Sequence, residues 1–93
     1  MGNKRFASVW DAIEDRPEQA ENMKLRSELM VALKTNLTRS RLSQAEIAKL
    51  FGVTQPRVSD LMRGKVNLFA LDALVNMAVA AGLKVRISLR RAA

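Results

Sequence analysis

The chain has 93 residues, a formal net charge of +7, and neither cysteine nor histidine. This length predicts one small domain, residues 1–93, and the missing residue types exclude disulfides, the usual zinc sites and catalysis by cysteine or histidine. No apolar run approaches the roughly 20 residues that span a bilayer, and no signal-peptide pattern opens the chain. We therefore expect a cytoplasmic, non-enzymatic protein without membrane contact, cofactor or metal.

The basic residues are concentrated in the second part of the chain. Residues 1–33 hold five basic and six acidic residues, whereas residues 34–93 hold eleven basic and three acidic ones. Such an asymmetry predicts that the second part meets a polyanion such as nucleic acid. The alternative is ordinary solubility, because small domains often carry a net charge of this size.

The N-terminal extension, residues 1–16, contains a short apolar segment from Phe6 to Ile13 that predicts one or two helical turns. Its Trp10 is either a core anchor or a ligand stack. Acidic residues in and after the extension favour a helix start with a solvated face, or a docking site for a basic partner. They are Asp11, Glu14, Asp15, Glu18 and Glu21.

A long helix is predicted to begin at Pro17 and to end near Arg39 or Ser40. Asp15 can cap it, and the proline falls in the first turn, where its missing N–H is harmless. Leucines that recur every four residues predict one apolar stripe along this helix. They are Leu25, Leu29, Leu33 and Leu37, with Met30 beside them.

The next helix begins with a capping box, in which Ser43 and Glu46 satisfy each other's backbone N–H groups. It is predicted to run to Phe51 and to end at Gly52, a residue suited to a left-handed turn. Ala48 lies in its middle, where a small side chain lets a second helix cross closely.

A third helix is predicted from the Thr54 cap to a stop at Gly64, with Pro56 tolerated in the first turn. If Val58 points inward, Leu61 and Met62 flank it on the buried side. The outward face then carries no large apolar side chain, which fits a helix lying in a DNA major groove. That outward face consists of Gln55, Pro56, Ser59, Asp60 and Arg63, with Arg57 on its shoulder.

A fourth helix, capped by Asn67 and ending at Gly82, completes a predicted helical core at 17–82. Residues 84–90 then alternate polar and apolar side chains, which is typical of a half-buried strand. A lone strand needs a backbone partner, and the same strand of a second subunit can supply it across a two-fold axis. Dimerisation would then use Val85, Ile87 and Leu89. The alternatives are a frayed tail within residues 83–93 and pairing with the segment near Phe6 to Val9.

The helix-turn-helix spacing at 42–64 resembles the lambda-repressor/Cro-like family, also called XRE, in the runs Leu42–Ala48 and Gly52–Gly64. The whole chain, from Val9 to the terminal strand, resembles the subgroup of HigA-type antitoxins. The resemblance implies a mainly α, lambda-repressor-like bundle of four to five helices with one C-terminal β-strand.

The resemblance also implies DNA-binding roles for single residues. Gln55 matches a glutamine that pairs with adenine. Arg57 and Asp60 match positions that contact base edges or adjacent phosphates, where Arg57 can read guanine and Asp60 can accept from cytosine N4. Pro56 departs from the usual polar residue and can touch only a thymine methyl, while Asp60 can instead repel phosphate or pair with Arg57 or Arg63. The candidates for reading bases are Gln55, Pro56, Arg57, Ser59 and Asp60. The candidates for binding phosphate are Gln44, Thr54, Arg63, Lys65 and Asn67.

These residues predict a transcriptional regulator that binds double-stranded DNA in the bacterial nucleoid. We expect a homodimeric autorepressor that reads a palindromic operator through the helix at 54–63. The alternative is a HigA-like antitoxin whose acidic N-terminal region neutralises a small basic toxin protein and whose DNA binding serves autoregulation.

Overall fold

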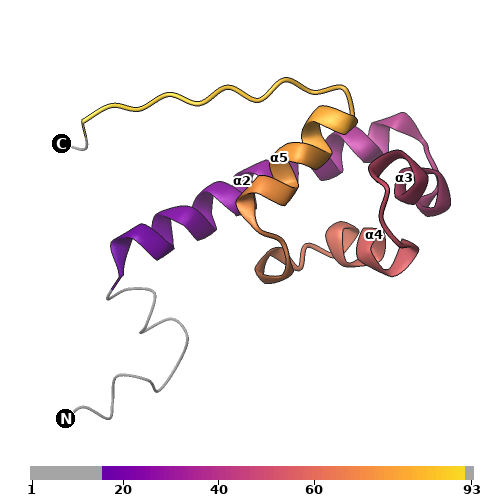
Figure 1. Ribbon diagram of the computed structural model, residues 1–93, viewed down its shortest axis with the longest axis horizontal. Helices are drawn as coiled ribbons and strands as arrows, with labels where there is room; N and C mark the ends of the chain where they lie inside the picture. Colours follow the sequence, from indigo (N-terminus) through magenta and orange to yellow (C-terminus); the bar gives the residue numbers. More distant parts are fainter. Residues whose placement is uncertain (1–15, 92–93) are drawn as a thin grey trace, which may run out of the picture.

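The computed structural model describes residues 16–91, and these residues form four α-helices and one 3-10 turn (Figure 1). In chain order they are α2 (Pro17–Ser40), α3 (Gln44–Phe51), α4 (Gln55–Met62), η2 (Val66–Leu68) and α5 (Leu71–Ala80). The mainly α fold is therefore confirmed, and α3 and α4 begin at their predicted caps, Ser43 and Thr54. The helix α2 begins at Pro17 as predicted, but its N-cap residue is Arg16, without a side-chain cap bond, rather than Asp15. The predicted segment from Phe6 to Ile13 and Trp10 lie outside the described residues.

The long helix α2 is buried only over its second half. Met30, Leu33 and Leu37 are 2% exposed or less, whereas Leu25 is 43% exposed. Figure 1 shows the first turns of α2 projecting beyond the other helices. Of the predicted leucine stripe, Leu29, Leu33 and Leu37 therefore pack in or against the core, whereas Leu25 stays at the surface. Within residues 16–91, no helix has both the length and the apolar character that crossing a bilayer requires.

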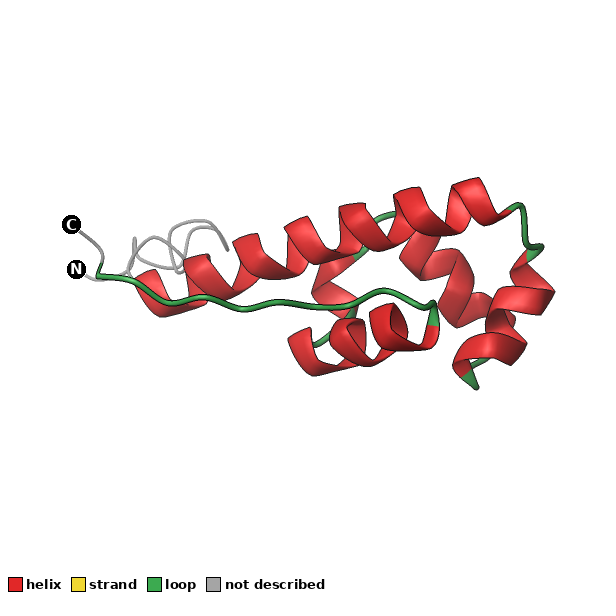
Figure 2. Ribbon diagram, turned by 90° about the horizontal axis from the view of Figure 1, so that it is seen from above, coloured by secondary structure: helices red, strands yellow, loops and turns green. Residues whose placement is uncertain are grey.

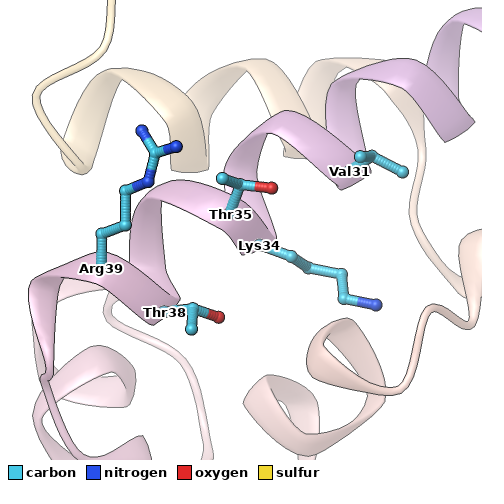
Figure 3. Close-up of a pocket in the computed structure, with 5 residues that line it drawn as sticks. All are labelled: Val31, Lys34, Thr35, Thr38 and Arg39. Atoms are coloured by element: carbon cyan, nitrogen blue, oxygen red, sulfur yellow. The ribbon is translucent and has the colours of Figure 1, made fainter.

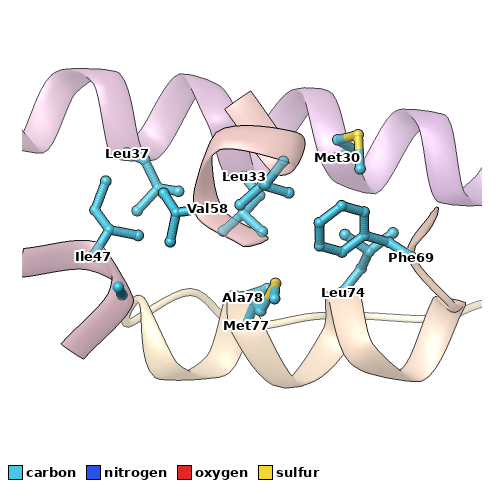
Figure 4. Packing of buried hydrophobic residues seen from close by; sticks show 11 residues of the cluster. Met30, Leu33, Leu37, Ile47, Val58, Phe69, Leu74, Met77 and Ala78 are labelled. Atoms are coloured by element: carbon cyan, nitrogen blue, oxygen red, sulfur yellow. The ribbon is translucent and has the colours of Figure 1, made fainter. Parts of the chain in front are cut away.

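The core lies between α2 and α5, which run side by side, and α3 and α4 close it at one end (Figures 2 and 4). Its largest fully buried side chains come from every helix and from the segment before α5. They are Phe69, Leu33, Leu37, Ile47, Leu61, Leu74 and Val58. Because each helix contributes to one cluster, the positions of α3 and α4 depend on the α2–α5 pair.

The prediction that Asn67 caps the fourth helix is wrong. Asn67 lies inside η2, and α5 begins only after Ala70, which has extended backbone angles and no side-chain cap bond. Between them Phe69 is extended, with φ −125° and ψ 121°, and its side chain is 1% exposed. Phe69 takes an extended conformation when its ring is buried, which interrupts the helical backbone. The helix α5 therefore begins at Leu71, three residues after the end of η2.

The predicted C-terminal strand is not seen either, because residues 83–91 of the single chain form no strand. This segment runs as an extended chain back along α2, on the opposite side of the bundle from α4 (Figure 1). Leu83 and Val85 pack against the core, but Ile87 and Leu89 are 80% and 94% exposed. The neighbouring elements are helices whose backbone groups bond internally, so they cannot supply a strand ladder. The alternative partner near Phe6 to Val9 lies outside the described residues.

We predict that Leu33→Ala lowers the free energy of unfolding by about 2–5 kcal/mol, because Leu33 is fully buried and its loss leaves a cavity. Leu25→Ala is the matched control on the same helix, and its cost should be below about 1 kcal/mol because the side chain is partly solvated. Urea denaturation of both variants measures the difference. Equal losses in the two variants would contradict the assignment of the core to the second half of α2.

Candidate nucleic-acid interface

The start of α3 is held by the predicted capping box. The backbone N–H of Glu46 donates to Ser43 Oγ at 3.1 Å, and the backbone N–H of Ser43 donates to Glu46 Oε1 at 2.8 Å. The box leaves Gln44 at the first helical position with an exposed side chain. The N-terminus of α3 thus presents the polar side chain of Gln44 beside the Ser43–Glu46 capping box.

The turn between α3 and α4 is tight and has a left-handed residue. Gly52 has φ 70°, and the N–H of Val53 donates to the carbonyl of Ala48 at 2.9 Å. Thr54 then caps α4, because its Oγ1 accepts the Arg57 N–H at 3.3 Å. Ala48 and Val58 are both buried where the two helices meet. This is a helix-turn-helix, and each predicted element of the turn is confirmed.

The two sides of α4 differ as the helical wheel predicts. Val58 and Leu61 are 1% and 0% exposed, and Met62 packs against the core from the same side. No large hydrophobic residue of α4 is exposed. The helix therefore uses one side to attach itself to the bundle and leaves a polar side for a partner.

The predicted contact residues lie at the start of α3, along α4 and in the segment that follows α4. The candidates for phosphate binding all have exposed side chains, namely Gln44, Thr54, Arg63, Lys65 and Asn67. Gln55 and Pro56 are exposed as well, at the N-terminal end of α4, whereas Arg57, Ser59 and Asp60 are half-buried. The most accessible base-reading candidates therefore lie at the end of α4 that follows the turn.

Arg57 is turned back toward the protein. Its Nη1 donates to the carbonyl oxygen of Leu68 at 2.9 Å, and its guanidinium carbon lies 4.0 Å from the centroid of the Phe69 ring. Sequence reasoning did not single out Phe69, because it falls in a short apolar run, Leu68–Leu71, without a helical or strand period. Nothing local to Arg57 indicates a partner eleven residues further along the chain.

Asp60 pairs with a different cation from those expected. Its Oδ1 lies 3.5 Å from the Nζ of Lys65, rather than beside Arg57 or Arg63. Both side chains remain partly solvated, so the pair adds little to stability. It does hold Lys65 next to α4, and it compensates the negative charge that Asp60 brings to this surface.

Two further basic residues, Lys34 and Arg39, lie on the second half of α2, where their side chains extend in different directions (Figure 3). Val31, Lys34, Thr35, Thr38 and Arg39 line a shallow depression there. A Cβ built on Gly64, which has φ 77°, would lie 3.5 Å from the Nζ of Lys34. Lys34 thus adds a positive charge at the C-terminal end of α4, where a cation is favoured. Residues 16–91 hold no group of three or more carboxylates that could bind a metal ion.

Comparison with known proteins agrees with this geometry. The helix-turn-helix domain family matches residues 12–90 of the chain. A solved structure described as an XRE-family transcriptional regulator is 34% identical, with a TM-score of 0.73 over 78% of this chain and 82% of that chain. No curated protein matches the chain.

We predict that Thr54→Ala lowers the free energy of unfolding by about 1 kcal/mol, because the cap bond to the Arg57 N–H is lost. Thr54→Ser keeps the hydroxyl and should retain most of the stability. Chemical denaturation of both variants measures the effect. A serine variant as unstable as the alanine variant would show that the hydroxyl does not cap α4.

Proposed function

The chain belongs to the XRE family of helix-turn-helix DNA-binding proteins, and on that premise we propose that it is a homodimeric repressor of its own promoter. Its target would be a palindromic operator, with one α4 entering each of two successive major grooves about 34 Å apart. The observation that carries the proposal is the polar, exposed end of α4 on a helix whose other side is buried.

In this proposal, the outward side of α4 recognises the DNA bases. Gln55 can donate to and accept from the adenine edge in bidentate fashion, and Pro56 beside it can contact a thymine methyl. Ser59 and Asp60 lie further along the helix, and Asp60 can accept from cytosine N4. Because Arg57 bonds to Leu68, we do not count it among these base readers.

Affinity comes from the residues around that helix. Gln44 and Thr54 precede the two helices of the motif, and Arg63, Lys65 and Asn67 follow α4. Contacts from these groups to phosphates release counterions, so binding should weaken steeply as salt rises. They orient the protein on the duplex without distinguishing one sequence from another.

We predict that Gln55→Ala weakens binding to the preferred duplex by about 1–3 kcal/mol and leaves the thermal midpoint unchanged, because the side chain is exposed at the start of α4. Gln19→Ala, an exposed glutamine in the first turns of α2, is the matched control and should bind as the unaltered protein does. Fluorescence anisotropy on a duplex selected from a randomised library measures both. Equal affinity of the two variants would remove Gln55 from the recognition surface.

The extended C-terminal segment, residues 83–91, supports the proposed homodimer. Ile87 and Leu89 follow the partly buried Val85 at alternate positions, so all three can share one side of an extended chain. Two copies of this segment, antiparallel across a two-fold axis, would cover both apolar side chains and supply the missing backbone hydrogen bonds. The pairing would lie on the side of the bundle away from α4 and leave that helix free.

We predict that Ile87→Lys converts the dimer to a monomer without unfolding it, because Ile87 contributes to pairing but not to the core of one copy. Val79→Lys is the matched control, since Val79 is 60% exposed on α5. Light scattering measures the mass of each. A dimer that persists in Ile87→Lys would contradict pairing through the tail.

A second candidate function follows from the acidic residues at the start of the chain. Glu18 and Glu21 are exposed in the first turns of α2, beyond the core, while Asp11, Glu14 and Asp15 lie outside the described residues. This region could bind a small basic toxin, as in HigA-type antitoxins, with DNA binding reserved for autoregulation. A gene for a small basic protein next to this one, whose product co-purifies with the chain, would favour that function.

A further inference from the structure

Two arginines from different helices bind adjacent peptide carbonyls between η2 and α5. Arg57 of α4 donates from Nη1 to the Leu68 carbonyl at 2.9 Å, and Arg26 of α2 donates from Nη1 to the Phe69 carbonyl at 3.3 Å. We call Arg26 and Arg57 together the arginine clamp. It ties the segment that follows α4 both to α4 itself and to the longest helix of the bundle.

The clamp depends on the shape of the guanidinium group. The guanidinium carbon of Arg57 lies 4.0 Å from the centroid of the Phe69 ring. The same guanidinium donates a hydrogen bond to the carbonyl oxygen of Leu68. A planar, delocalised cation can stack on a ring and donate along its own plane at once, whereas a lysine ammonium cannot do both. Within residues 16–91, neither arginine of the clamp forms a salt bridge with a carboxylate. Their partners are the carbonyls and the ring.

The clamped segment carries part of the proposed DNA surface. Lys65 and Asn67 lie just before Leu68 and Phe69, in and beside η2, whose turn is closed by bonds from Leu68 N–H to Lys65 and from Phe69 N–H to Val66. Arg57 itself lies two residues after Gln55, on the helix proposed to read bases. Lys65 is tied to α4 by its own N–H, which donates to the Asp60 carbonyl at 3.1 Å, and by its ion pair with Asp60. Arg57 adds a second link from α4, to the Leu68–Phe69 end of the same segment.

We propose that Arg57 is a positioning residue for DNA binding, one that sets the 65–69 segment relative to α4 instead of reading a base. This role rests on the proposed function, in which α4 enters the major groove. Arg57 would fix where Lys65 and Asn67 lie relative to Gln55. When Gln55 contacts a base, Lys65 and Asn67 would then lie opposite particular phosphates. The base-reading surface then consists of Gln55, Pro56, Ser59 and Asp60.

The free protein provides the first test. Arg57→Met and Arg57→Lys should each speed amide hydrogen exchange at Leu68 and Phe69 by about 10-fold, because a hydrogen bond from a charged group is lost. Exchange in α3 should stay unchanged in both variants. Arg63→Met is the matched control, because Arg63 is exposed at the end of α4 with no described side-chain bond, and it should leave the 65–69 segment protected.

A double-mutant cycle on DNA provides the second test. The probe is the duplex that the unaltered protein enriches from a randomised library. Arg57→Met alone should weaken binding about 10- to 100-fold. The double variant Arg57→Met/Lys65→Gln should lose less affinity than the two single variants predict together, because both residues act through one segment. Its fold-loss of affinity should be at least about 5-fold smaller than the product of the two single fold-losses. When Arg57→Met is combined with Gln44→Ala on α3, the losses should multiply.

The outcomes separate this proposal from the function on which it rests. Unchanged exchange at Leu68 and Phe69, or losses that multiply with Lys65→Gln as they do with Gln44→Ala, would overturn the positioning role. Faster exchange with multiplying losses would also overturn it, since the clamp would then serve only the fold. If the unaltered protein enriches no duplex, the proposed function fails before any variant is made, and the role of Arg57 in DNA binding fails with it.

Discussion

The burial of one side of α4 is the constraint on which the candidate site depends. A helix of eight residues is too short to persist alone in water, so it must be stabilised by packing. Val58 and Leu61 supply that packing against the core between α2 and α5, and the Thr54 cap and Gly64 limit the helix at its two ends. Because the large apolar residues are all on the inner side, the outward side is left to polar residues and Pro56. The same packing that forms the helix therefore orients its contact surface.

Much of this arrangement could be predicted from the sequence, because its signals are local. A capping box, a threonine cap and a glycine with positive φ each act within about four residues, and each appears where the sequence predicts it. The inward position of Val58 likewise follows from the helical period alone. The family resemblance added the expected DNA-binding roles of Gln44 and Gln55, which local signals alone do not predict.

The features that the sequence did not predict depend on contacts between distant residues. Asn67 looks like a cap, but the burial of Phe69 decides where α5 begins, and that burial depends on α2 and α4. The direction of Arg57 depends on the same ring and on the Leu68 carbonyl. The alternation at 84–90 indicates an extended segment correctly, yet a strand needs a partner backbone that one copy of the helical bundle does not provide. Part of the basic excess also lies on this tail, on the side away from α4, so net charge alone overstates the charge available near α4.

Fluorescence anisotropy of the unaltered protein measures whether α4 reads a DNA sequence upstream of its own gene. The duplex upstream of its own gene and a scrambled duplex of the same composition would be titrated at several salt concentrations. Our account predicts a preference of about 10³ or more for the upstream duplex, with both affinities falling as salt rises. Equal, salt-sensitive binding to both duplexes would contradict repression of its own promoter, and the operator would then lie elsewhere or require a partner that supplies specificity.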